Sequence, residues 1–122
     1  MLYIGSRVKV IDNSGARLVK CLKILGKSPK SRAQIGDLVV VSIVKAMPNK
    51  KVKKGEIYKA VVVRLRFKTY RYGGLYIFSE TSSVILLNNK MTVLGTRVLG
   101  PVCNELRQKN FLKIISLSPA VV

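Results

Sequence analysis

Four lysines stand close together in the segment Lys50-Lys51-Val52-Lys53-Lys54. Pro48 and Asn49 precede this segment and Gly55 follows it, a composition that predicts an exposed turn. Ammonium groups crowded on one turn repel each other unless water or phosphate groups screen them. A solvated hairpin end is the plainest interpretation of this segment alone. We favour contact with phosphate groups because two further basic segments occur in the same chain.

The second basic segment, residues 26–36, contains Gly, Pro and Ser and is predicted to be a loop. It has no acidic residue, and its cations are Lys27, Lys30 and Arg32. The third segment, residues 67–74, interleaves cations with aromatic residues: Phe67, Lys68, Tyr70, Arg71 and Tyr72. Such rings can stack on unpaired RNA bases while the cations contact the backbone. Alternate aromatics in a strand also pack inward or pair across strands, so the two interpretations stay open.

The charge of the whole chain supports a polyanionic partner. The 122 residues include 23 Lys and Arg against 5 Asp and Glu, which leaves a formal charge of +18. Like charges of this density destabilise a compact state, and nucleic acid is the leading candidate to neutralise them. An acidic membrane surface usually goes with a basic amphipathic helix, which the sequence lacks. The 48% hydrophobic content excludes a disordered basic tail.

The acidic and sulfur-containing residues argue against catalysis. The chain has no His, and its five acids are far apart in sequence: Asp12, Asp37, Glu56, Glu80 and Glu105. This spacing shows no paired-carboxylate or metal-ligand pattern, so we expect no enzyme, no metal and no cofactor. Cys21 and Cys103 lack CxxC spacing and are expected in the core of a protein from a reducing compartment. No apolar run approaches the roughly 20 residues that span a bilayer.

The basic segments lie between predicted β-strands. Alternation predicts a strand over residues 7–11, and a Val-, Leu- and Ile-rich run predicts another over residues 16–25. The turn formers Asp12-Asn13-Ser14-Gly15 join them into a β-hairpin. Residues 38–46 are apolar with almost no alternation, which predicts a strand buried on both faces. Residues 57–67 are the longest β-branched stretch and predict a second hairpin with that strand.

The later part of the chain predicts shorter elements. Strands are expected over residues 75–78, 84–87 and 95–100. Pro101 suits the first turn of a helix, and the Glu105 and Lys109 pair supports a short one there. Residues 111–117 fit either a helical turn or a strand. We therefore expect one domain over residues 1–122, mainly β, a small closed β-barrel with short C-terminal helices.

Five strings distributed over the chain carry a resemblance to a known family. They are VIDNSGAR (10–17), KVKKGEIYKAVVVR (51–64), VILLNN (84–89), GTRVLGPV (95–102) and NFLKIISLSP (110–119). In one register they resemble the universal large-subunit ribosomal protein family numbered fourteen. The aromatic residues of segment 67–78 depart from the usual Lys- and Gly-rich form of that family.

This resemblance implies a fold and a function. The fold is a five-stranded β-barrel with a protruding β-hairpin and C-terminal helical turns. Proteins similar to this one bind large-subunit rRNA, contact neighbouring ribosomal proteins and contribute to intersubunit bridges with small-subunit rRNA. The family also provides a docking surface for silencing factors that block subunit joining.

The resemblance and the basic segments together name the candidate site residues. The expected RNA ligands are Arg17, Lys27, Lys30, Arg32, Lys45, Lys50, Lys51, Lys53, Lys54, Lys59, Arg64, Lys68 and Arg71. The expected intersubunit or protein contacts lie in the C-terminal region, at Arg97, Arg107, Lys109 and Lys113.

Two rival functions remain at this point. An OB-like single-stranded RNA-binding translation factor would place its aromatic residues on one exposed barrel face, and a basic protein-interaction scaffold would bind an acidic protein instead. The high charge and the abundance of Lys, Ile and Leu suggest a mitochondrial ribosome and an organelle-encoded gene, with a bacterial cytoplasm as the alternative. The N-terminal residues lack the pattern of a secretory or transit segment, which agrees with that expectation.

Overall fold

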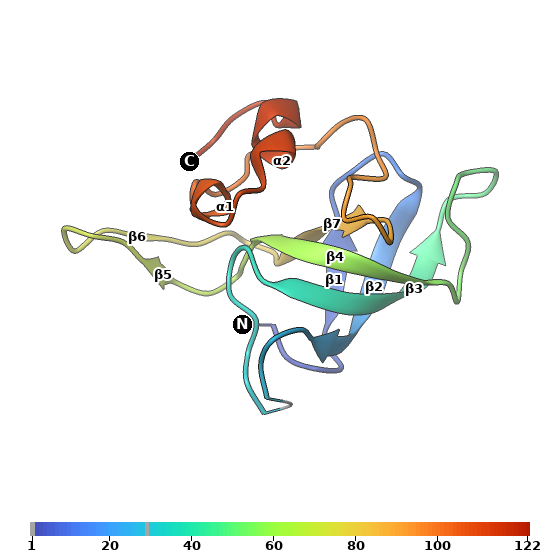
Figure 1. Ribbon diagram of the computed structural model, residues 1–122, viewed down its shortest axis with the longest axis horizontal. Helices are drawn as coiled ribbons and strands as arrows, with labels where there is room; N and C mark the ends of the chain where they lie inside the picture. The colour runs from blue at the N-terminus through green and yellow to red at the C-terminus, as the bar shows by residue number, and fades with distance from the viewer. Residues whose placement is uncertain (1, 29) are drawn as a thin grey trace.

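Five strands close into a barrel in the computed structural model, which describes residues 2–28 and 30–122. They are β1 (Arg7–Val10), β2 (Ala16–Ile24), β3 (Leu38–Ala46), β4 (Ile57–Arg64) and β7 (Ser83–Leu87), in the order β1-β2-β3-β4-β7 (Figure 1). Neighbours pair antiparallel except β1 and β7, which close the barrel as a parallel pair. The barrel and the two hairpins predicted from the sequence are confirmed.

Two further pieces complete the fold. Strands β5 (Thr69–Tyr70) and β6 (Tyr76–Ile77) form a separate antiparallel ribbon that projects from the barrel (Figure 1). Helices α1 (Glu105–Gln108) and α2 (Leu112–Leu117) lie together on one side of the barrel. The ambiguous segment 111–117 is thus helical from Leu112 onward, and the predicted protruding hairpin and C-terminal helices are confirmed.

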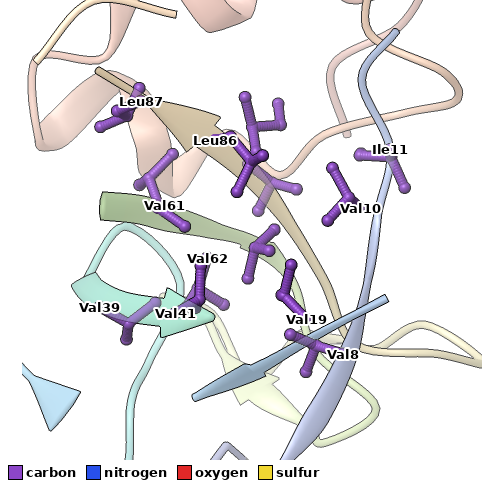
Figure 2. Close-up of a cluster of buried hydrophobic side chains, with 14 of the residues drawn as sticks. Val8, Val10, Ile11, Val19, Val39, Val41, Val61, Val62, Leu86 and Leu87 are labelled. Carbon is purple, nitrogen blue, oxygen red and sulfur yellow. The ribbon is translucent and has the colours of Figure 1, made fainter. Parts of the chain in front are cut away.

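The core follows from the alternation of the strands. In β1, Val8 and Val10 are buried while the basic residues between and beside them are exposed. Figure 2 shows such side chains from several strands, among them Val19, Val41 and Val61, meeting inside the barrel. Each apolar side chain of this size contributes about 1.5–3 kcal/mol when fully buried.

The two cysteines, Cys21 and Cys103, are free and buried, as expected. The pKa of the Cys103 thiol is raised to about 11, mainly by burial and to a smaller extent by the negative charge of Glu105.

The turn between β1 and β2 is tied to β7 by a buried carboxylate. Asp12 Oδ1 accepts hydrogen bonds from the Ser14 N–H at 3.1 Å and the Ser14 hydroxyl at 2.5 Å. Asp12 Oδ2 accepts a third from the backbone N–H of Leu86 at 3.2 Å. Burial raises the pKa of Asp12, and these hydrogen bonds partly counteract the rise. The first hairpin and the last barrel strand are therefore connected through one side chain.

Three of the predicted elements are wrong in detail. Strand β3 alternates between buried and half-buried residues and is not buried on both faces, because one face of a small barrel is covered only in part. Strand β4 ends at Arg64, three residues before the predicted end at residue 67. The strand expected over residues 95–100 does not form. In the closed barrel, β1 and β7 are already paired on both sides and offer no free edge to a further strand. Val98 therefore forms only an isolated β-bridge with Asp12.

The predicted helix begins later than expected. Pro101 lies outside α1, so its expected place in the first helical turn is wrong. The reason is that Val102 is extended: its N–H donates to Ala120 at 3.1 Å, and its carbonyl accepts from Val122 at 2.9 Å. This pairing ties the end of the described chain to the segment before α1. Leu106 and Ile114 then extend from α1 and α2 into the core.

Candidate nucleic-acid interface

The β3–β4 loop, residues 47–56, is held to the barrel by one apolar side chain. Val52 is buried, whereas the four flanking lysines are exposed: Lys50, Lys51, Lys53 and Lys54. Glu56 Oε1 accepts a hydrogen bond of 2.5 Å from the backbone N–H of Lys53, which closes the turn. Lys51 Nζ also lies 3.4 Å from the carbonyl oxygen of Leu94. The loop thus presents a cluster of cations on a conformation that the buried Val52 holds in place.

The β1–β2 turn packs against this loop. Gly15 has φ +108°, and a Cβ at this position would lie 2.2 Å from the Cβ of Lys50, so only glycine fits. Its carbonyl oxygen accepts a 2.7 Å hydrogen bond from the N–H of Met47. Arg17 and Lys45, both exposed, lie nearby on β2 and β3, where Leu18 pairs with Lys45. These predicted ligands are therefore brought to the same end of the barrel as the lysine cluster.

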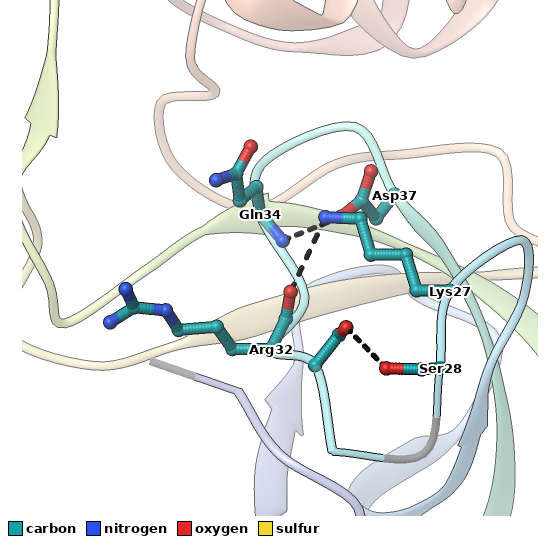
Figure 3. A network of polar contacts seen from close by, with 6 residues as sticks. Lys27, Ser28, Arg32, Gln34 and Asp37 are labelled. Atoms are coloured by element: carbon teal, nitrogen blue, oxygen red, sulfur yellow. Dashed lines mark hydrogen bonds and ion pairs between the residues drawn. The ribbon is translucent and has the colours of Figure 1, made fainter.

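The three cations of the β2–β3 loop have different surroundings, and Figure 3 shows two of them, Lys27 and Arg32. Lys27 Nζ lies 2.7 Å from the Asp37 carboxylate and 3.3 Å from the carbonyl oxygen of Arg32, so an internal acid neutralises it. Lys30 is exposed on the same loop. The exposed Arg32 guanidinium lies 5.7 Å from the ring centroid of Phe67, which links this loop to the start of the ribbon. Lys30 and Arg32 are the accessible members of this predicted group.

The two predicted ligands on β4 are less accessible. Lys59 and Arg64 are half-buried on the barrel wall. Arg64 Nη2 donates to Ser83 Oγ at 3.3 Å, while its Nε is buried without a hydrogen-bond partner among the described residues. A Cβ added to Gly100 would lie 3.2 Å from Arg64 Nη1. Arg64 therefore packs under the segment that precedes Pro101, where it contacts β7.

On the ribbon, Arg71 has an internal partner and Lys68 is exposed. Arg71 Nε and Nη2 donate to the two Glu105 oxygens at 2.5 and 3.0 Å, a bidentate pair, and Nη2 also donates to the carbonyl oxygen of Val122. The hydrogen bonds that Arg71 donates to the Glu105 carboxylate raise the pKa of Arg71. Burial alone would raise the pKa of Glu105, but Arg71 holds it below its usual value. The guanidinium of Arg71 thus joins the ribbon to α1.

The C-terminal candidates are exposed but come from separate places. Arg97 follows the barrel, where its backbone N–H donates to Asn13 Oδ1 at 3.1 Å. Arg107 is on α1 and Lys113 on α2. The stem of Lys109 lies over Gly36, since a Cβ there would be 2.7 Å from Lys109 Cγ. Lys109 is therefore next to the β2–β3 loop.

Sequence reasoning missed a basic surface on the first hairpin. Its exposed cations are Arg7, Lys9, Lys20 and Lys23, with Arg66 beside Arg7 and Lys9. Arg7 pairs directly with Lys20 across β1 and β2, and like charges in this position are destabilising without an anion between or above them. A hollow of about 490 Å³ beside them is lined by Arg7, Lys9 and Arg66, with Glu80 as its acid. The strict alternation of residues 7–10 is the signal that places these cations outside the barrel.

The described cations thus occur at both ends and along the wall of the barrel. Figure 1 shows the β3–β4 loop and the β5–β6 ribbon at opposite ends of the molecule. Residues 1–122 match the family model described as ribosomal protein L14p/L23e. The chain belongs to this family. As a member of the L14p/L23e family, it is a structural component of the large ribosomal subunit and not an enzyme.

In the described ranges, 2–28 and 30–122, no three His, Cys, Asp or Glu side chains come together in a way that could hold a metal ion. No described helix is long and apolar enough to cross a membrane. Among the residues named above as RNA ligands, Arg71 has a bidentate acid partner in Glu105, and Lys27 forms an ion pair with Asp37.

Proposed function

We propose that this L14p/L23e member binds large-subunit rRNA, mainly through contacts from Lys and Arg to phosphate groups. The observation that carries the proposal is the lysine cluster of the β3–β4 loop, exposed around the buried Val52 with no acidic side chain paired to it in the described structure. Such contacts hold little sequence information, so the shape of the RNA and of the barrel must provide selectivity. Cations at both ends of the barrel favour RNA on several sides of the protein.

The affinity of the full chain for large-subunit rRNA should therefore fall steeply with salt. Each neutralised phosphate lowers log K by roughly 0.7–0.9 per decade of salt, so about ten contacts give a slope of roughly −7 to −9. Filter binding or fluorescence anisotropy over a salt series measures this slope. An affinity for rRNA that does not change with salt would contradict the proposal, and so would preferential binding to an acidic protein that survives nuclease treatment.

We also propose that the C-terminal region faces the small subunit or a neighbouring ribosomal protein. Arg97, Arg107 and Lys113 are exposed there and suit small-subunit rRNA. An apolar hollow of about 170 Å³ beside Lys113, lined by Met91, Phe111 and Leu112 among others, suits a protein such as a factor that silences subunit joining. The Lys-, Ile- and Leu-rich composition favours a mitochondrial ribosome over a bacterial one.

Large subunits that carry Arg97→Gln, Arg107→Gln and Lys113→Gln should join small subunits on the order of tenfold more weakly. The estimate takes roughly 0.5 kcal/mol for each exposed charge contact. Sedimentation of mixed subunits over a magnesium series measures joining. The variant's abundance in the isolated large subunit is the control, because it must be incorporated normally. Normal incorporation together with unchanged joining would show that these residues do not form a bridge.

A further inference from the structure

The β5–β6 ribbon has two unlike faces. Tyr70 pairs directly with Tyr76, and side chains directly opposite in an antiparallel pair lie on the same face. Because side chains alternate along a strand, Lys68 and Phe78 share this face, which we call the outer face. Its rings are largely exposed: Tyr70 72%, Tyr76 49% and Phe78 60%.

The opposite face of the ribbon is anchored to the rest of the molecule. Ile77 and Thr69 pair with each other there and are half-buried, and Ile77 packs against the hydrophobic core. Arg71 lies on the same face and makes its bidentate pair with Glu105 of α1. These contacts fix the orientation of the ribbon, so the outer face is turned to solvent in a defined way.

The rings of the outer face lie next to one another. The centroids of Tyr70 and Tyr76 are 6.2 Å apart with the rings at 60°, and those of Tyr76 and Phe78 are 6.1 Å apart at 23°. Lys68 Nζ lies 4.5 Å from the centroid of Tyr76. Beyond them, Tyr72 on the connecting loop is fully exposed. A group of exposed aromatic side chains on so small an element usually marks a binding surface.

Charge indicates which partner this surface takes. Lys68 lies among the rings of the outer face, and residues 66–79 contain no acidic residue, whereas Arg71 is on the opposite face and paired with Glu105. A surface that binds an apolar protein patch does not require cations among its rings. A surface that binds RNA uses rings and cations together, because bases stack on aromatic faces while phosphates contact Lys and Arg. Paired bases are already stacked within a duplex, so exposed rings select unpaired ones.

We propose that the outer face, Lys68, Tyr70, Tyr76 and Phe78 with Tyr72 at the tip, is a stacking platform for unpaired RNA bases. The inference rests on the proposed function and adds to it the class of RNA at this place: a single-stranded loop, bulge or end. The lysine cluster of the β3–β4 loop, at the other end of the molecule, contacts phosphates and does not distinguish paired from unpaired RNA.

The double variant Tyr70→Leu with Tyr76→Leu tests the platform in the full chain. Leucine keeps the face apolar and the charge unchanged but removes the rings. The probes are a short oligouridylate and an RNA duplex of equal length. Stacking changes the affinity by roughly 5- to 150-fold per base, so the affinity of the double variant for oligouridylate should fall at least about 5-fold. Its affinity for the duplex and the salt slope of duplex binding should not change. Tyr72→Leu should give a smaller loss in the same direction.

Tyrosine fluorescence gives a second readout. The chain has five Tyr and no Trp, and three of the five are Tyr70, Tyr72 and Tyr76. Oligouridylate should quench the fluorescence of the wild-type protein, and quenching should be lost in the double variant. Leu75→Ala is the matched control, because it keeps all five tyrosines and removes an exposed apolar side chain next to Tyr76 but on the other face of the ribbon; it should bind both probes normally.

The outcomes separate this inference from the proposed function. An unchanged affinity of the double variant for oligouridylate overturns the platform, and the proposed function stands if duplex binding still depends on salt. If that variant then fails to enter large subunits, the ribbon docks a protein instead. A wild-type protein that binds neither probe nor rRNA overturns the proposed function and the platform together.

Discussion

Replacing the four lysines of the β3–β4 loop, Lys50, Lys51, Lys53 and Lys54, by Gln is expected to weaken rRNA binding by roughly three orders of magnitude at about 0.1 M salt. If each lysine neutralises one phosphate, the salt slope becomes shallower by roughly 3, and the difference between variant and wild type disappears near 1 M salt. The fold should be retained, because the side chains are exposed and the loop is held by the buried Val52.

The matched control keeps the charge and changes only the chemistry of the cations. The same four positions as Arg should leave the salt slope unchanged, since the slope counts charges. Binding isotherms of both variants at several salt concentrations give the comparison. A four-Gln variant with the wild-type slope would show that these lysines form a solvated hairpin end, the alternative that the sequence left open.

The second large effect is expected at the buried carboxylate of Asp12. Asp12→Ala leaves the backbone N–H groups of Ser14 and Leu86 without their acceptor, and a buried unsatisfied donor costs about 1–3 kcal/mol. We therefore expect the free energy of unfolding to fall by roughly 2–5 kcal/mol, measured by denaturant unfolding. Ser14→Ala removes only the hydroxyl donor and should cost about 1 kcal/mol. Equal losses in the two variants would contradict the role given to Asp12.

Asp12 is also expected to make the free energy of unfolding depend on pH. Its pKa is raised in the folded state above the ordinary 3.8, chiefly by burial, so the folded protein holds the proton to higher pH than the unfolded chain. The Asp12 carboxyl therefore makes its full contribution to the free energy of unfolding below pH 3.8, the ordinary pKa, and loses it as the pH rises through the raised pKa of the folded state. Asp12→Asn removes this dependence, so the difference in stability between wild type and variant should change with pH in that window. Because Glu105 is present in both proteins, its opposite dependence cancels.

The barrel was predictable because local patterns and barrel geometry agree. The turn formers at residues 12–15 and the alternation around Val8 and Val10 specify the first hairpin without tertiary information. The strand expected over residues 95–100 failed because closure of the barrel leaves no free edge, and no local pattern contains that fact. The positions of the exposed cations on loops followed from composition, and those of Arg7 and Lys20 were available from alternation.

Pairing between distant residues was not predictable. Arg71 and Glu105 are 34 residues apart, and nothing in either segment indicates that the ribbon meets α1. The same contact decides which face of the ribbon is free. Sequence alone left open whether the aromatic residues of segment 67–74 pack inward, and the structure shows that Tyr70 and Tyr72 are exposed.

The parallel pairing of β1 with β7 also determines when the barrel can close during synthesis. Strand β1 begins at residue 7, but its partner β7 spans residues 83–87, so the two cannot meet until most of the chain has been made. Without β7, β4 would be an edge strand of the sheet, and a free Val-rich edge is prone to pairing with other chains. Long-range closure of this kind is slow relative to hairpin formation. Pairing of β4 with β7 covers that edge, so the last barrel strand both closes the barrel and removes a site of unwanted pairing.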